Sequence, residues 1–138
     1  CTSFKVELLK GVHNFTATTG NTFKIALYDS DATLGASTTA FSTSEEITNT
    51  SGTAYTSGGA SLTSVTPVAS STTAICDFAD VSYSSASFTA NGALIYNSSA
   101  SNVAVCAIAF GSDKTATNGT FTIQFPTADA TNAIIRLA

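Results

Sequence analysis

Few side chains in this sequence are of the types that catalyse reactions, and their spacing matches no familiar catalytic arrangement. The only histidine is His13, and no serine lies in the Gly-x-Ser-x-Gly pattern that exposes a nucleophile on a tight turn. A serine–histidine–aspartate site would have to recruit this single histidine. We therefore interpret His13 as a surface or helix-end residue, and we expect no catalytic residue and no enzymatic activity.

The acidic residues form only local pairs. Asp29 and Asp31 follow a predicted strand, and Glu45 and Glu46 are neighbours. The aspartates could offer oxygen ligands to calcium, but the glycine and the distal glutamate of an EF-hand loop are missing. Carboxylates that accept hydrogen bonds from turn N–H groups explain this spacing better. Gly58-Gly59 lacks the Lys-Ser/Thr of a phosphate-binding loop, so we expect no metal and no other cofactor.

Three cysteines, Cys1, Cys76 and Cys106, stand at no spacing typical of a metal site. The last two lie in strand-like segments, and unpaired cysteine is among the most buried residue types. We interpret them as small apolar residues. A Cys76–Cys106 disulfide is the alternative, and it requires neighbouring strands with Cα atoms about 4.4–6.8 Å apart. Cys1 could be a free thiol or a link between subunits.

The overall composition excludes several classes of protein. Serine and threonine make up 43 of 138 residues, whereas charged residues make up 10% and the net charge is −4. The five basic residues are scattered, so no cluster could follow a nucleic acid backbone. No apolar stretch approaches the roughly 20 residues of a membrane span. A hydrophobic fraction of 43% argues against disorder, and we expect one folded domain over residues 1–138.

The only predicted helix is the N-terminal segment, residues 1–15. Ser3 could cap it, and Gly11 and Asn14 could end it after two to three turns. Its apolar residues recur at helical spacing: Phe4, Leu8, Leu9, Val12 and Phe15.

From Thr22 onward the apolar pattern changes to period two, which is typical of strands. Phe23, Ile25 and Leu27 share one face of the first predicted strand. The segment Ala36–Ser61 is poor in large apolar residues and predicts a long loop with a short strand near Glu45–Thr48. Further strands are predicted at Ala60–Thr66, Thr72–Phe78, Val81–Tyr83, Phe88–Ala90, Ala93–Tyr96, Val103–Phe110, Gly119–Phe125 and Ala133–Leu137.

Three details constrain how these strands are arranged. The alternation slips between Leu62 and Val65, as at a bulge, and Pro67 favours a sheet edge or a strand end. Val103–Phe110 is apolar on both faces, so we expect it at the centre of a sheet or against a partner. Turns are predicted at Ala90–Gly92, Asn97–Asn102 and Gly111–Asn118.

Eight to nine short strands and one short helix predict an all-β fold, a β-sandwich or a jelly-roll-like barrel. Six segments in their order resemble a family of small virion structural proteins of tailed bacteriophages. These segments are Phe4–Gly11, Phe23–Tyr28, Gly52–Gly59, Gly92–Tyr96, Ala107–Lys114 and Gly119–Phe125. The resemblance implies a β-rich particle protein without enzymatic activity, and the nearest role is that of a capsid decoration, or cement, protein.

This role gives a concrete hypothesis. The protein would be made in the host cytoplasm, assemble as a dimer or trimer, and bind the major capsid protein across subunits on the capsid exterior. The predicted contact residues lie in the N-terminal segment and the long loop: Phe4, Leu8, Phe41 and Tyr55. Alternatively, the helix only plugs one end of the sandwich.

A rival hypothesis is a receptor- or carbohydrate-binding module of a tail tip or fibre. Such a module would use exposed tyrosines together with Asn and Asp side chains in loops. The available tyrosines are Tyr28, Tyr55, Tyr83 and Tyr96.

Overall fold

The computed structural model describes residues 1–48 and 55–138. The chain folds mainly into β-strands arranged in two antiparallel sheets, with one short N-terminal helix, as the sequence predicts. The elements are α1 (Thr2–Leu9), β1 (Phe23–Tyr28), β2 (Ala60–Ser61), β3 (Ser64–Ser70), β4 (Thr73–Phe78), β5 (Val81–Asn97), β6 (Val103–Ile123) and β7 (Ile135–Leu137).

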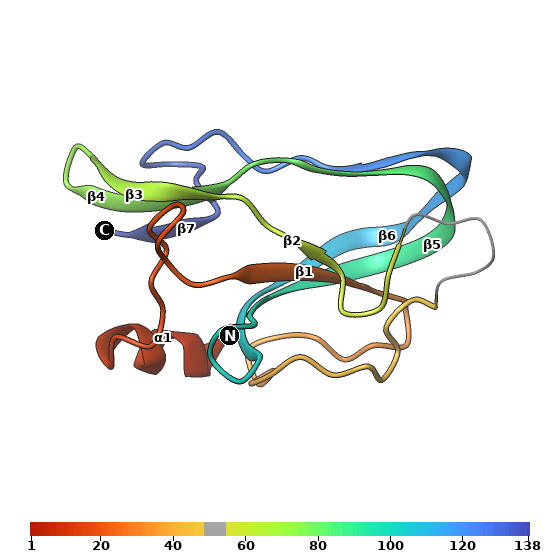
Figure 1. Ribbon diagram of the computed structural model, residues 1–138, viewed down its shortest axis with the longest axis horizontal. Coiled ribbons are helices and arrows are strands. Elements are labelled where there is room, and N and C mark those ends of the chain that lie inside the picture. The colour runs from red at the N-terminus through yellow and green to blue at the C-terminus, as the bar shows by residue number, and fades with distance from the viewer. Residues whose placement is uncertain (49–54) are drawn as a thin grey trace.

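The strand order is β2-β1-β5-β6 in one sheet and β3-β4-β7 in the other. The long hairpin of β5 and β6 belongs to both layers of the molecule. Its two strands run together beside β1, bend together at one end and return above β1 towards β3 and β4 (Figure 1). The apolar core fills the space between these two arms, because the inward faces of both arms carry the large side chains.

The bend of the hairpin corrects the prediction of separate short strands. The predicted turns at Ala90–Gly92 and Gly111–Asn118 are wrong, because both segments lie inside the continuous strands β5 and β6. The pairing shifts register between Ala90 and Gly92, and Gly111 has a φ of +78°. Residues that favour turns therefore form bulges here, which bend a strand without reversing it. The described chain has seven strands in place of eight to nine.

The predicted alternation of β1 is confirmed. Phe23, Ile25 and Leu27 lie in the core between the layers, and Ala26 and Tyr28 face the opposite side of the sheet. That opposite side is covered by the loop that follows β1, in which Phe41 stacks on Tyr96 with ring centroids 4.6 Å apart. Both faces of β1 are thus buried. Because β1 also pairs with β2 on one edge and with β5 on the other, it is a central strand.

The alternation of apolar and polar residues is interrupted between Leu62 and Val65 because the chain passes from one sheet to the other there. The predicted bulge is therefore not the cause of the interruption. β2 pairs with β1, whereas β3 pairs with β4 in the other sheet. Pro67 lies in β3, which is an edge strand, and the β3–β4 register shifts between Val65 and Val68. The predicted edge position of Pro67 is confirmed, because proline cannot donate to a neighbouring strand.

The helix is shorter than predicted. It has eight residues, its N-cap is Cys1 rather than Ser3, and Gly11 beyond its end has a φ of +68°. Only Phe4 is buried on it, so it does not have the continuous apolar face that was expected. Among the described residues no helix is long and apolar enough to cross a membrane.

The short strand predicted at Glu45–Thr48 does not form, and a single bridge between Glu46 and Tyr28 takes its place. In the predicted loop Ala36–Ser61 the other described residues before β2 are irregular, apart from a second bridge at Ala40. Residues 49–54 of this loop lie outside the described part. The turn predicted at Asn97–Asn102 is confirmed, since it joins β5 to β6.

Candidate binding surface at the open edge of the sandwich

The outer edge of β6 ends the larger of the two sheets. Three other edges carry features that discourage pairing with another chain: β2 has two residues, β3 contains Pro67 and a register shift, and β7 has three residues, one of them Arg136. The first arm of β6, Val103–Phe110, contains neither a charge nor a proline. Within the described chain no strand lies on its outer side, so the prediction of a central position is wrong.

Among the described residues, the protein itself covers the beginning of this edge, and α1 also contacts β6. The N–H of Phe41 donates to the carbonyl of Asn102 (2.9 Å), and the N–H of Ala104 donates to the carbonyl of Thr39 (2.9 Å). These bonds form an antiparallel bridge between Ala40 and Val103. The edge thus already accepts a short extended segment, whose hydrogen bonds to β6 end at Ala104. Next to this segment, Cys1 packs against the apolar clusters on both faces of the sheet.

Beside the uncovered edge lies an apolar groove of about 710 Å³. It opens between the two arms of β6, where Phe110 from the first arm and Phe121 from the second have ring centroids 6.3 Å apart. Its apolar lining is Ile108, Phe110, Phe121, Ile123, Phe125 and Ile134. Most of these side chains are only partly buried against the core, so the core is open to solvent on this side.

The two charged residues of the groove have partners within their own hairpin, and its other polar side chains are uncharged: Thr115, Thr120, Thr122 and Gln124. Asp113 accepts a hydrogen bond from the side-chain amide of Asn91 (2.8 Å), and the Lys114 ammonium donates to the Ser112 hydroxyl (3.0 Å). An apolar groove beside free backbone groups suits an extended polypeptide, whose main chain pairs with the edge while alternate side chains enter the groove.

Of the four predicted contact residues two are buried and two are partly buried, and Phe41 belongs to the segment that covers the beginning of the β6 edge. Phe4 is 8% exposed and Tyr55 is 0% exposed. Leu8 packs partly against the core, and Phe41 covers the outer side of the sheet. Phe4 lies against His13 and Phe15, with ring centroids 5.0 and 6.2 Å away. This geometry favours the alternative in which the helix plugs the sandwich, because Phe4 and Tyr55 offer almost no area to a partner.

The tyrosines proposed for a carbohydrate-binding module are also unavailable. All four are buried, with exposed fractions of at most 5%. Burial raises the pKa of Tyr28 and of Tyr83 to about 12 and also raises the pKa of Tyr55 and Tyr96. The rival hypothesis therefore loses the aromatic side chains on which it depended.

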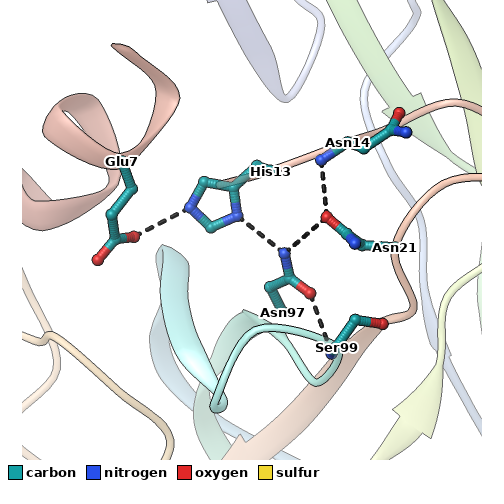
Figure 2. Close-up of polar contacts among 6 residues, drawn as sticks. All are labelled: Glu7, His13, Asn14, Asn21, Asn97 and Ser99. Carbon is teal, nitrogen blue, oxygen red and sulfur yellow. Dashed lines mark hydrogen bonds and ion pairs between the residues drawn. The ribbon is translucent and has the colours of Figure 1, made fainter. Parts of the chain in front are cut away.

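His13 is buried and lies outside the helix, so its interpretation as a surface or helix-end residue is wrong. Its Nε2 lies 2.9 Å from a carboxylate oxygen of Glu7, and its Nδ1 lies 3.1 Å from the side-chain nitrogen of Asn97 (Figure 2). Asn97 donates in turn to Asn21 (3.1 Å) and accepts from the N–H of Ser99 (3.1 Å). Both ring nitrogens are occupied by groups that join α1 to the hairpin, so the network fastens the N-terminal segment.

The two neighbouring glutamates have different environments. Glu46 is buried and accepts hydrogen bonds from the Tyr55 hydroxyl (2.6 Å), the Gly58 N–H (2.6 Å) and the Ser57 hydroxyl (2.7 Å). Glu45 is exposed. Glu46 therefore organises the loop in front of β2, a role that its sequence context did not indicate.

The exposed Glu45 lies near Asp29 and Asp31, and carboxylate oxygens of the three residues are within 4.8 Å of one another. Asp29 accepts a hydrogen bond from the N–H of Asp31 (2.9 Å), which confirms the predicted turn. All three carboxylates lie in loops.

All three cysteines are free thiols. Cys76 lies in β4 and Cys106 in β6, which are in different sheets and do not pair, so the disulfide alternative is wrong. Cys76 is buried as predicted, and burial raises its pKa to about 12, whereas Cys106 is only partly buried.

Comparison of the chain with protein-family models, with curated proteins and with solved structures finds no match. The sequence did contain a signal for the open edge. Val103–Phe110 is apolar on both faces, a pattern that predicts either a central strand or a strand that packs against a partner. The strand lies at an edge, so the first alternative is wrong and the second stays a prediction.

Proposed function

We propose that this protein is a structural component of a virus particle, which decorates and stabilises the capsid by binding across major capsid protein subunits. The observation that supports an adhesive role is the unprotected edge of β6 beside an open apolar groove. Solitary β-proteins usually block such edges, because an open edge pairs with other chains. The resemblance to phage virion proteins is the reason for proposing a virus particle as the place where the protein binds.

The proposed mechanism depends on stiffness and repetition. The bent hairpin of β5 and β6 connects the two layers of the sandwich by continuous strands. A force applied where one capsid subunit binds is therefore transmitted through paired strands to the site where another subunit binds. Each specific contact needs on the order of 1,000 Å² of buried surface or more to be stable. Many copies on one shell then turn modest affinities into strong overall binding.

The test is the number of copies in purified particles of the virus that encodes the protein. A decoration protein should be present in hundreds of copies on a mass-calibrated gel, in fixed ratio to the major capsid protein. Removing the gene should give shells that release DNA at a lower temperature, and adding the purified protein should restore them. A handful of copies would indicate a tail component instead, and absence from particles would refute a virion role.

A further inference from the structure

We infer that the open edge of β6 joins two copies of this chain, with the first arm of each β6 paired antiparallel to the other about a two-fold axis. This inference deepens the proposed function and rests on it for its biological setting, since it names the self-association that a capsid clamp would use. The sites of contact are the edge residues Ala107–Phe110 and the adjoining groove.

The backbone geometry shows which groups are free to pair. A Cβ placed on Gly92 of β5 would lie 2.8 Å from the carbonyl oxygen of Ile108, so the backbone of Ile108 faces β5. Successive strand residues direct their hydrogen-bonding groups to opposite sides. The backbone groups of Ala107 and Ala109 therefore face outward, beyond the part of the edge that Thr39–Phe41 covers. Within the described residues, the Ala107 carbonyl accepts only the weak donor Cys106 Sγ (3.7 Å).

A second copy fits this edge for three reasons. Antiparallel pairing of an edge strand with itself satisfies the free groups of both copies at once, and it closes after two copies. The outward residues Ala107 and Ala109 are small and uncharged, so two backbones can approach closely. If the axis lies at Ile108, Ala107 falls opposite Ala109 of the second copy, and no residue between Val105 and Phe110 is charged, so no like charges meet.

The groove gains a cover in the same arrangement. Pairing of the two first arms extends the layer that contains β1, so the groove of one copy lies beside the groove of the other. Ile108, Phe110 and Phe121 of each copy would then leave water together, and burial of apolar surface is the main favourable contribution to association.

The experiment compares two lysine substitutions by sedimentation equilibrium of the isolated protein at micromolar concentration. The unmodified chain should have a mass of 28 kDa, twice its 14.0 kDa. Ala109→Lys places two like charges beside the two-fold axis, and it should weaken the dimer by about tenfold or more. Ala69→Lys makes the same change at an exposed position of the protected edge strand β3, and it should leave the dimer intact.

Amide hydrogen exchange of the unmodified protein gives a second readout that needs no variant to fold. On dilution below the dimer dissociation constant, exchange at Ala107 and Ala109 should accelerate, whereas exchange at Ile25 in the central strand should not. A monomeric unmodified protein, a dimer that Ala109→Lys leaves unchanged, or exchange at these alanines that is independent of dilution would each overturn the inference. The proposed capsid role would survive such results, because particle copy number measures it separately.

Discussion

Glu46 is the one carboxylate that is buried among the described residues, and its two oxygens accept three hydrogen bonds. Two of the donors belong to the segment just before β2, namely Ser57 and the backbone of Gly58. The third donor is the Tyr55 hydroxyl, which also accepts a hydrogen bond from the N–H of Leu27 in β1 (3.0 Å). A single side chain thus holds the loop against the central strand.

Glu46→Gln should therefore lower the free energy of unfolding by about 1–3 kcal/mol, because its NH₂ group would face donors that need an acceptor. Urea denaturation followed by circular dichroism measures this loss. The matched control is Glu45→Gln at the exposed neighbour, which should change stability by no more than about 0.5 kcal/mol. Equal effects of the two substitutions would contradict the role assigned to Glu46.

The turn that leads into β2 depends on two adjacent glycines with different constraints. Gly58 and Gly59 have φ values of +86° and +71°, in the left-handed region. A Cβ on Gly59 would overlap the carbonyl oxygen of Ile25 in β1, whereas a Cβ on Gly58 would lie 3.6 Å from its nearest neighbours. Close approach of the backbone to β1 therefore requires glycine at position 59 but not at position 58.

Gly58→Ala should cost about 1–2 kcal/mol for the left-handed backbone alone. Gly59→Ala should cost at least about 3 kcal/mol, because β2 must also move away from β1. Thermal unfolding of both variants provides the comparison. The assignment fails if Gly58→Ala proves the more damaging of the two.

The N-terminal helix can be tested in the same manner. Phe4 is buried against His13 and Phe15, whereas Leu9 at the end of α1 is 92% exposed. Phe4→Ala should destabilise the isolated protein by about 3 kcal/mol or more, and Leu9→Ala should cost no more than about 0.5 kcal/mol. Chemical denaturation of both variants decides between the plug and a contact role. If Phe4→Ala keeps full stability but no longer binds capsids, the helix is a contact element.

The molecule as a whole should unfold at alkaline pH. The pKa of Tyr28 and of Tyr83 rises from an ordinary value of 10 to about 12 on folding, because burial disfavours the charged form. Above pH 10 the unfolded chain therefore loses protons that the folded chain retains. Stability should be constant with respect to these groups below pH 10 and should fall as the pH rises through 12.

Tyrosinate absorbance and circular dichroism, recorded together during an alkaline titration, measure this behaviour. The absorbance should rise in one step that coincides with loss of structure, and the urea-unfolded protein should titrate near pH 10. Tyrosines that ionise near pH 10 while the circular dichroism signal stays native would show that the side chains are accessible.

The sequence by itself determined the all-β class, the short helix at the N-terminus and the pattern of β1. Alternation of Phe23, Ile25 and Leu27 is a local property, because a strand directs successive side chains to opposite faces whatever it packs against. The edge position of Pro67 was equally predictable, since the missing N–H is a property of the residue.

Only the tertiary structure decided whether a turn residue reverses the chain or bends it. Asn91-Gly92 and Gly111 favour reversal when considered alone, yet β5 and β6 pair on both sides of them and convert both sites into bulges within one bent hairpin. Tertiary packing also buried His13, Glu46 and all four tyrosines and left the first arm of β6 at an edge. Burial and edge position depend on which distant segments meet, and neighbouring residues in a sequence carry no such information.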